Sequence, residues 1–291
     1  MRLVLVNGEP KAPEEAFVSV YDRGFLYGDS VFETIRTYGG KPFALDEHMA
    51  RLARSAERVL IDLPLTPEEL AQEVERAVEL AQNPESSIRV MLTRGTGPLG
   101  LDPDLARHPS RFVFVEPLKT PAAEAYREGI KVLLVRTSRV TDATSAAGAK
   151  FANYLTSLLA LREAKQAQAA EALIVDARGF VLEGATSNVF VVTNGELWTP
   201  PESAGILAGI TRAHLLEAAK TLGIPVRLEE LPEQAIFDAD EVFISSSIRE
   251  VLPVVRVNEQ TIRDGTPGVV TRRLHSAFRK AAGAPGPDPW V

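Results

Sequence analysis

Glu183 stands at a point in the sequence where a carboxylate is costly to bury. An apolar run ends at Leu182 and a second apolar run begins at Val189, so both neighbours are strand-like and suited to burial. The carboxylate must therefore be paired or hydrogen-bonded, unless it lies in water at a strand edge. The residues from Gly184 to Asn188 are small and polar, so a large group can approach the backbone and find hydrogen-bond donors there.

The run from Glu183 to Phe190 resembles a signature of the fold-type IV pyridoxal-phosphate enzymes, E-G-x-x-S-N followed by an apolar strand. That family includes branched-chain aminotransferases, D-amino acid aminotransferases and aminodeoxychorismate lyases. Five motifs between Val18 and Val254 follow the order of the family. The resemblance implies a two-domain α/β (α+β) fold and pyridoxal 5'-phosphate as cofactor. It also implies that Glu183 keeps the pyridine nitrogen protonated.

Lys150 is the predicted Schiff-base lysine. It follows a tract of small residues at 141–149, where nothing bulky blocks a ring, and Asn153 completes a K-x-x-N spacing similar to that of the family. An exposed lysine is the alternative. Burial would lower the pKa of the amine by disfavouring its charged form, so the freed amine could carry a proton. The resemblance implies that Tyr154 donates to the ring oxygen; a core tyrosine is the alternative.

The phosphate of such a cofactor needs an anion site. Arg51 lies in the E-H-x-x-R-L motif of the family, and its planar fork suits phosphate, although a solvated arginine is the alternative. Gly209 opens a G-I-T-R helix start, which offers N–H groups and a helix dipole. The resemblance implies a second phosphate turn and an apolar shelf for the ring. The predicted cofactor residues are Arg51, Tyr154, Glu183, Leu207, Gly209, Ile210, Thr211, Ser246 and Ser247.

The substrate pocket resembles that of branched-chain enzymes. In the loop Arg94–Pro103, here the 94–103 loop, the Gly-Pro-Leu-Gly-Leu stretch at 97–101 lacks the Arg and His of D-amino acid enzymes and the basic and aromatic residues of the lyases. Arg249 replaces a small residue of branched-chain enzymes; an ion pair with Glu250 or Asp240 is its alternative role. The predicted substrate-binding residues are Tyr27, Phe32, Thr34, Arg36, Arg89, Leu99, Leu101, Ile248 and Arg249, with Arg94 as a further carboxylate partner. No metal site is predicted.

Hydrophobic periodicity predicts the elements that must position these residues. Expected strands cover 2–6, 16–20, 31–38, 88–93, 112–115, 130–135, 173–175, 180–182, 189–192, 226–229, 241–244 and 254–257. Expected helices cover 45–60, 66–82, 153–165, 205–223 and 268–280. The helix at 153–165 should bury Leu155, Leu158, Leu159 and Leu161. Prolines near 119–129 suggest a linker between a small N-terminal α/β domain, 1–118, and a large C-terminal cofactor domain, 130–291.

Composition limits the class of protein. The chain has 291 residues, a net charge of −7 and no cysteine, which disfavours a nucleic-acid partner and thiolate chemistry. No signal peptide or membrane-length apolar run is recognisable, so we expect a cytoplasmic protein without a membrane partner. The apolar tips of the 94–103 loop, Leu99 and Leu101, favour a homodimer, as in the family, in which each subunit completes its neighbour's site.

The sequence therefore predicts a pyridoxal-phosphate-dependent aminotransferase that acts on hydrophobic, branched-chain-like amino acids with a 2-oxo acid acceptor. One rival is a lyase that releases pyruvate from aminodeoxychorismate with the same lysine. Others are a D-amino acid or (R)-amine transaminase and a non-catalytic carrier of the cofactor. The carrier is disfavoured because it needs no electron sink such as Lys150 and Glu183 would support.

Overall fold

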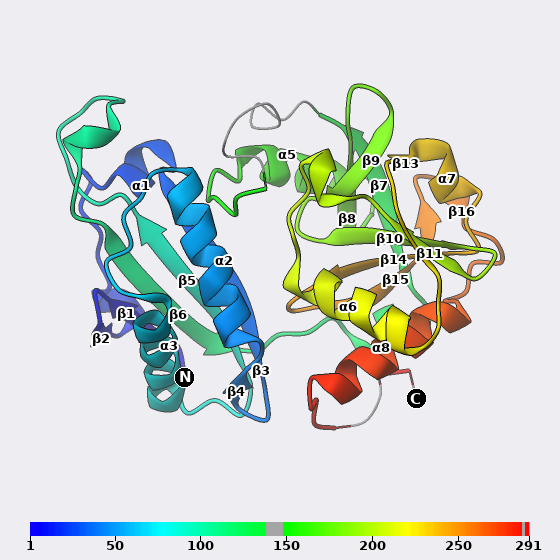
Figure 1. Cartoon of the computed structure of the whole chain (residues 1–291), viewed down its shortest axis with the longest axis horizontal. Coiled ribbons are helices and arrows are strands. Elements are labelled where there is room, and N and C mark those ends of the chain that lie inside the picture. The colour runs from blue at the N-terminus through cyan, green and yellow to red at the C-terminus, as the bar shows by residue number, and fades with distance from the viewer. Residues whose placement is uncertain (138–147, 287–288, 291) are drawn as a thin grey trace. The chain divides into compact units, whose positions relative to one another are not determined.

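Two units make up the chain in a computed structural model that describes residues 1–137, 148–286 and 289–290 (Figure 1). The first unit is Met1–Lys119 with Ala149–Tyr154, and the second is the described part of Thr120–Gly148 with Leu155–Val291. Most of the small-residue tract predicted before Lys150 lies outside the described residues. The domain limits expected from the sequence stay a prediction, because a compact unit of the structure is not thereby shown to fold independently.

An antiparallel sheet forms the centre of the first unit, with strand order β2-β1-β6-β5-β3-β4. Its strands are β1 (Leu3–Val6), β2 (Glu9–Lys11), β3 (Ser30–Tyr38), β4 (Lys41–Pro42), β5 (Ser86–Thr93) and β6 (Ser110–Pro117). Helices α2 (Leu45–Arg58) and α3 (Pro67–Ala81) pack on this sheet (Figure 1). The short helix α1 (Arg23–Tyr27) precedes β3, and 3-10 turns occupy Pro13–Glu15 and Pro103–Leu105.

Local sequence rules account for several of these elements. Thr66 and Glu69 form a capping box at the start of α3, in which each side chain accepts a hydrogen bond from the other residue's backbone N–H. Asn7 and Gly8 both have positive φ in the β1–β2 turn, as the Asn-Gly hairpin signal requires. Successive side chains of strand β3 point to opposite faces of the sheet, so Phe32 lies beside Lys150 whereas Glu33 contacts Arg51.

The second unit is built on a larger mixed sheet with strand order β12-β11-β10-β14-β15-β7-β8-β9-β13 and β16 beside β15. Its strands are β7 (Ile130–Arg136), β8 (Glu171–Val175), β9 (Phe180–Gly184), β10 (Asn188–Thr193), β11 (Glu196–Thr199), β12 (Val226–Leu228), β13 (Leu231–Pro232), β14 (Glu241–Ser246), β15 (Glu250–Val257) and β16 (Gln260–Thr261). Its helices are α4 (Ala123–Arg127), α5 (Leu155–Gln166), α6 (Ile210–Thr221), α7 (Glu233–Phe237) and α8 (Val269–Ala281), with a 3-10 turn at Glu202–Ala204.

The expected strand at 16–20 is wrong. The segment is irregular, and its apolar side chains Phe17, Val18 and Val20 are exposed. The A-F-V-S-V pattern has the composition of a strand, but a strand forms only where a neighbouring strand completes its hydrogen bonds. Among the described residues, none pairs with this segment.

Helix α5 buries a different face from the one expected. Ala160 and Ala164 are buried against β7 and β8, whereas Leu155, Leu158 and Leu159 are exposed. Small side chains let the helix lie close to the sheet, so packing distance outweighs the hydrophobicity of the leucines. The predicted linker also contains a helix, α4, whose Tyr126 is buried against the second unit's core.

Near the C-terminus, Trp290 makes a defined contact with the second unit. Its indole Nε1 donates to Nδ1 of His275 on α8 at 2.8 Å, and its ring lies edge-on to Tyr126. One aromatic residue therefore ties the Pro- and Gly-rich end of the chain to the second unit.

Candidate active site

Lys150 is held against the edge of β3 within the first unit. The N–H of Phe32 donates to the Lys150 carbonyl at 3.0 Å, and the N–H of Ala152 donates to Ser30 at 2.9 Å. The Lys150 N–H donates to the hydroxyl of Ser55 on α2 at 3.2 Å. The ammonium nitrogen lies 4.7 Å from the centre of the Phe32 ring. Its backbone is thus fixed on two sides while its amine lies over an aromatic face.

A buried carboxylate, Glu33, joins two residues of α2 on the other face of β3. Arg51 donates through Nε at 2.7 Å and through Nη2 to the two oxygens of Glu33, and His48 Nδ1 lies 2.7 Å from Oε2. Glu33 has no exposed surface, and His48 and Arg51 are nearly as buried. The predicted phosphate residue Arg51 is therefore oriented by a partner that the motif does not reveal.

Burial and charge act in opposite directions on this cluster. Burial alone raises the pKa of Glu33, but the charge and hydrogen bonds of Arg51, together with His48, outweigh it and lower that pKa to about 2. Burial lowers the pKa of His48; its contact with Glu33 opposes the shift, and the charges of Arg51 and Lys150 reinforce it. Glu33 is thus held as a carboxylate, and the charged form of His48 is disfavoured.

Glu183 is buried at the end of β9 in the second unit, so its alternative as a solvated residue is wrong. Its Oε2 accepts hydrogen bonds from the N–H of Leu207 at 3.0 Å and from the side-chain amide of Asn188 at 3.3 Å. Asn188 also donates to the Leu207 carbonyl at 3.0 Å. Asn188, the last residue of the E-G-x-x-S-N motif, therefore donates a hydrogen bond to the buried carboxylate of Glu183, the first residue of the motif.

The predicted phosphate-binding helix start is the beginning of α6. Gly209 is its N-cap, and no side chain of the described residues caps the first turn. A Cβ at Gly209 would lie 2.0 Å from the side-chain oxygen of Asn188, so only glycine fits there. Ile210 and Thr211 follow in the first turn, where N–H groups and the helix dipole favour an anion.

Hydroxyl groups from the turn after β14 complete this donor set. Ser246 and Ser247 are half-buried, and Ser246 Oγ accepts from the Arg249 N–H at 3.4 Å. The neighbouring Ser245 hydroxyl is buried and has no hydrogen-bond partner among the described residues. These hydroxyls, with the start of α6, have the chemistry of a phosphate site.

Arg212, the last residue of the G-I-T-R motif, is buried and was not among the predicted site residues. Burial lowers its pKa, whereas the carboxylates of Glu202 and Glu183 raise it. Its Nη2 donates to the Pro200 carbonyl at 2.9 Å. Arg212 is therefore a buried cation that interacts electrostatically with the carboxylates of Glu202 and Glu183.

Among the described residues, Arg249 pairs with Glu171 and not with Glu250 or Asp240, the partners considered as its alternative role. Its guanidinium donates to the fully buried Glu171 and, at 2.8 Å, to the hydroxyl of Thr186. Glu171 also accepts from the Thr186 hydroxyl at 2.7 Å. The pair therefore links the turn after β9 to the turn after β14.

The predicted substrate residues of the first unit gather on one face of β3 and β5. Thr34 lies opposite Arg89 in the sheet register, and the Arg89 guanidinium lies 4.7 Å from the centre of the Phe32 ring. The ring of Tyr154 is 5.3 Å from that of Phe32. Arg36 lies on the same face but is turned to the ring of Tyr38.

The remaining substrate predictions fall at two other places. Tyr27, at the end of α1, accepts a hydrogen bond from Gly100 of the 94–103 loop at 3.2 Å, and Leu99 and Leu101 are exposed. Ile248 lies in the turn beside Arg249 in the second unit. Each unit therefore carries its own set of predicted cofactor and substrate residues.

Comparison with known proteins identifies the family. A family model for class IV amino-transferases matches residues 30–257. The chain belongs to the class IV aminotransferases. It is 38% identical over 276 residues, 95% of either chain, to a protein of Methanocaldococcus jannaschii provisionally named a branched-chain-amino-acid aminotransferase. It is 32% identical to the D-alanine aminotransferase of Bacillus licheniformis, over 96% of either chain.

Solved structures support the same assignment. The branched-chain amino acid aminotransferase of Escherichia coli has a TM-score of 0.89 and 32% identity, covering 96% of this chain and 94% of its own. Another branched-chain aminotransferase, determined with pyridoxamine 5'-phosphate, has a TM-score of 0.91. The chain therefore has the fold of type IV enzymes and is a pyridoxal-phosphate-dependent transaminase. Its residues fit that cofactor, since they offer an amine, a buried carboxylate and an uncapped helix start with adjacent hydroxyls.

Proposed function

We propose that this transaminase takes the amino group from hydrophobic, branched-chain-like amino acids and delivers it to a 2-oxo acid. The supporting observation is the chemistry of the 94–103 loop. The one cation near its start, Arg94, donates through all three guanidinium nitrogens to Asp29 and to backbone carbonyls of Val59 and Leu60. Its exposed tips are Leu99 and Leu101, so the loop offers an apolar surface to a substrate side chain.

Lys150 is the residue we assign to cofactor attachment and proton transfer. The bound pyridoxal phosphate supplies an electron sink for the bond that breaks at the substrate carbon. Lys150, whose Nζ lies over the Phe32 ring, would take the proton from that substrate carbon and deliver it to the cofactor carbon attached to the amino nitrogen.

The other cofactor residues have binding roles in this proposal. Glu183 holds the proton of the pyridine nitrogen, and Leu207 forms the apolar shelf. Tyr154 donates to the ring oxygen. The residues that we assign to the phosphate are Gly209, Ile210, Thr211, Ser246 and Ser247 of the second unit and Arg51 of the first; each would hydrogen-bond to a charged phosphate oxygen.

The decisive experiment is a half-reaction screen with single amino donors, followed by the absorbance of the cofactor. We expect L-leucine, L-isoleucine and L-valine to convert the cofactor fastest. Borohydride reduction followed by peptide mapping should label Lys150 and leave the exposed Lys165 unlabelled. Pyruvate release from aminodeoxychorismate without a keto acid would identify the rival lyase and defeat the proposal.

D-alanine is the second candidate donor because D-alanine aminotransferases match nearly the whole chain. The 97–101 stretch of the loop lacks the Arg and His that the family resemblance assigns to D-amino acid enzymes, so we expect D-alanine to react more slowly than L-leucine. A faster reaction with D-alanine or with an (R)-amine would reverse this order.

We also propose that the enzyme is a homodimer in which Tyr27, Leu99 or Leu101 completes the neighbouring subunit's site. The surface of the first unit supports it, because several large apolar side chains are exposed there: Phe17, Val18, Val20, Tyr21, Phe25, Leu99 and Leu101. Such surfaces are uncommon on monomers, and a two-fold contact buries the same patch twice.

Light scattering and a mixed-dimer experiment test the homodimer. A Lys150→Ala subunit combined with a Leu101→Asp subunit should recover activity that neither has alone. A fully active monomer would contradict the proposal. The cytoplasmic location expected from the sequence stays a prediction; among the described residues, no helix is long and apolar enough to cross a membrane.

A further inference from the structure

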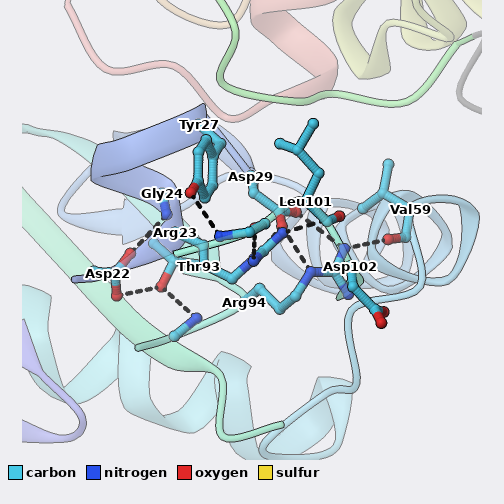
Figure 2. Close-up of polar contacts among 12 residues, drawn as sticks. Asp22, Arg23, Gly24, Tyr27, Asp29, Val59, Thr93, Arg94, Leu101 and Asp102 are labelled. Atoms are coloured by element: carbon cyan, nitrogen blue, oxygen red, sulfur yellow. Dashed lines mark hydrogen bonds and ion pairs between the residues drawn. The ribbon is translucent and has the colours of Figure 1, made fainter. Parts of the chain in front are cut away.

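The 94–103 loop is held by side chains of its own unit. Arg23, a buried residue of α1, donates through Nη1 to the Gly100 carbonyl at 2.8 Å and through Nη2 to the Leu101 carbonyl at 3.5 Å (Figure 2). The Tyr27 hydroxyl accepts from the Gly100 N–H at 3.2 Å. Both backbone groups of Gly100, at the centre of the loop tip, therefore have side-chain partners.

Asp29 connects this contact to a second arginine. Its Oδ2 accepts from Arg23 Nε at 3.1 Å and from Arg94 Nε at 2.7 Å, and its Oδ1 accepts from Arg94 Nη2 at 3.0 Å (Figure 2). Both arginine side chains are over nine-tenths buried. One carboxylate therefore neutralises two buried cations, and its removal leaves both without an anionic partner.

Arg94 extends the network to the end of α2. Its Nη2 donates to the Val59 carbonyl at 2.7 Å, and its Nη1 donates to the Leu60 carbonyl. These carbonyls lie at the C-terminus of α2, where orphan acceptors favour a cation. Because α2 also carries Arg51, the loop tip and the predicted phosphate residue are tied to the same helix.

The loop backbone leaves little room for another arrangement. The N–H of Arg23 donates to the Gly95 carbonyl at 2.9 Å, and the N–H of Gly97 donates to Tyr21 at 3.3 Å. A Cβ at Gly97 would lie 2.4 Å from the Leu105 carbonyl oxygen. The first half of the loop is thus packed closely against α1 and its own continuation.

We propose that Asp29 is a positioning residue that sets the substrate preference of this transaminase by fixing the 94–103 loop through Arg23 and Arg94. The inference rests on the proposed function in one respect, namely that Leu99 and Leu101 meet the substrate side chain. A fixed loop presents these two leucines as a rigid wall, which favours large apolar side chains that fill the space against it. A loosened loop accepts small and large side chains more equally.

Asp29→Asn is the test variant, because it keeps the shape of the side chain and removes the charge that both arginines share. Asp104→Asn is its matched control, since Asp104 follows directly after the loop but is exposed and forms only a long ion pair with exposed Arg107. Each protein is assayed for kcat and KM with L-leucine and with L-alanine. Hydrogen–deuterium exchange is measured in peptides that cover residues 97–101.

Asp29→Asn should raise the KM for L-leucine and lower the leucine-to-alanine ratio of kcat/KM by about tenfold or more, since hydrogen bonds to charged groups are lost. Exchange at 97–101 should accelerate, while cofactor absorbance and kcat at saturation stay near those of the parent. Asp104→Asn should change none of these. If Asp29→Asn does not fold, Arg23→Lys replaces it, because lysine keeps the charge but not the fork that reaches Gly100.

Unchanged exchange and an unchanged leucine-to-alanine ratio in Asp29→Asn would overturn the inference. A merely structural role would lower kcat for both substrates equally and release cofactor, and that result would overturn it as well. If the parent enzyme uses neither L-leucine nor any other hydrophobic amino acid, the proposed function fails, and the exchange experiment still decides whether Asp29 fixes the loop.

Discussion

Arg51 forms a bidentate ion pair with Glu33, in which Nε donates to one carboxylate oxygen and Nη2 donates to the other. Two nitrogens bound to one planar partner fix the plane of the guanidinium as well as its position. The arginine predicted to bind phosphate is thereby preorganised before any ligand arrives. Binding then costs less side-chain entropy than it would for an arginine in water.

Glu33→Gln should weaken cofactor retention by about tenfold or more, because the amide cannot hold Arg51 at two points with charge. It should also lower the free energy of unfolding by about 3–5 kcal/mol, since Arg51 becomes a buried cation without its anion. Equilibrium dialysis of the cofactor and urea denaturation measure the two effects. Glu73→Gln is the control: Glu73 is a buried partner of Arg111 elsewhere in the same unit, so it should affect stability without affecting retention.

Stability should fall in two stages as the pH is lowered. The folded state depresses the pKa of Glu33 from 4.5 to about 2, so its contribution is present above pH 4.5 and is lost as the pH falls towards 2. Burial depresses the pKa of His48 below 6.5, so the folded state resists its protonation and stability already declines below that pH. Urea denaturation from pH 8 to pH 3 measures both stages. In His48→Asn the decline near pH 6 should disappear and the acid stage remain.

Glu183→Gln should keep the fold and slow removal of the substrate proton by roughly 100-fold or more, because a neutral amide does not stabilise a protonated pyridine nitrogen. Stopped-flow single turnovers with L-leucine measure that step directly. Glu230→Gln, an exposed carboxylate of the same unit that pairs with Arg178, is the control and should leave the step unchanged. An equal rate in Glu183→Gln and the parent would assign Glu183 another role.

Arg249→Ala should destabilise the second unit by about 3–5 kcal/mol, because Glu171 then remains as a buried charge without its partner. Adding Glu171→Gln should recover part of that loss, since the unpaired charge is removed. Thermal denaturation of the single and double variants measures this coupling. If Arg249 instead binds the substrate carboxylate, Arg249→Ala will raise KM steeply while stability stays near that of the parent.

Much of the architecture follows from short-range rules. The capping box at Thr66, the Asn7-Gly8 turn and the G-I-T-R helix start each depend on residues within a few positions of one another, so the local sequence is enough to specify them. The strand expected at 16–20 failed because strand pairing depends on a distant partner, which one segment does not encode.

The site residues divide in the same way. Lys150, Glu183 and Arg51 lie in motifs that a single sequence can reveal. Their partners Glu33 and Glu171 lie 18 and 78 positions from the arginines they hold, Arg51 and Arg249. Contacts over such separations are set by tertiary packing, so neither carboxylate could be assigned from the sequence alone.

Neighbouring residues of strand β3 point to opposite faces of the sheet. Glu33 binds Arg51 on one face, and Phe32 lies beside Lys150 on the other. A substitution on the Phe32 face leaves the Glu33 face untouched. Insertion or deletion of one residue inside β3 would instead exchange the faces of every later residue in the strand. Natural variants and laboratory-evolved variants with a changed substrate range should therefore carry substitutions in this strand and no insertions or deletions.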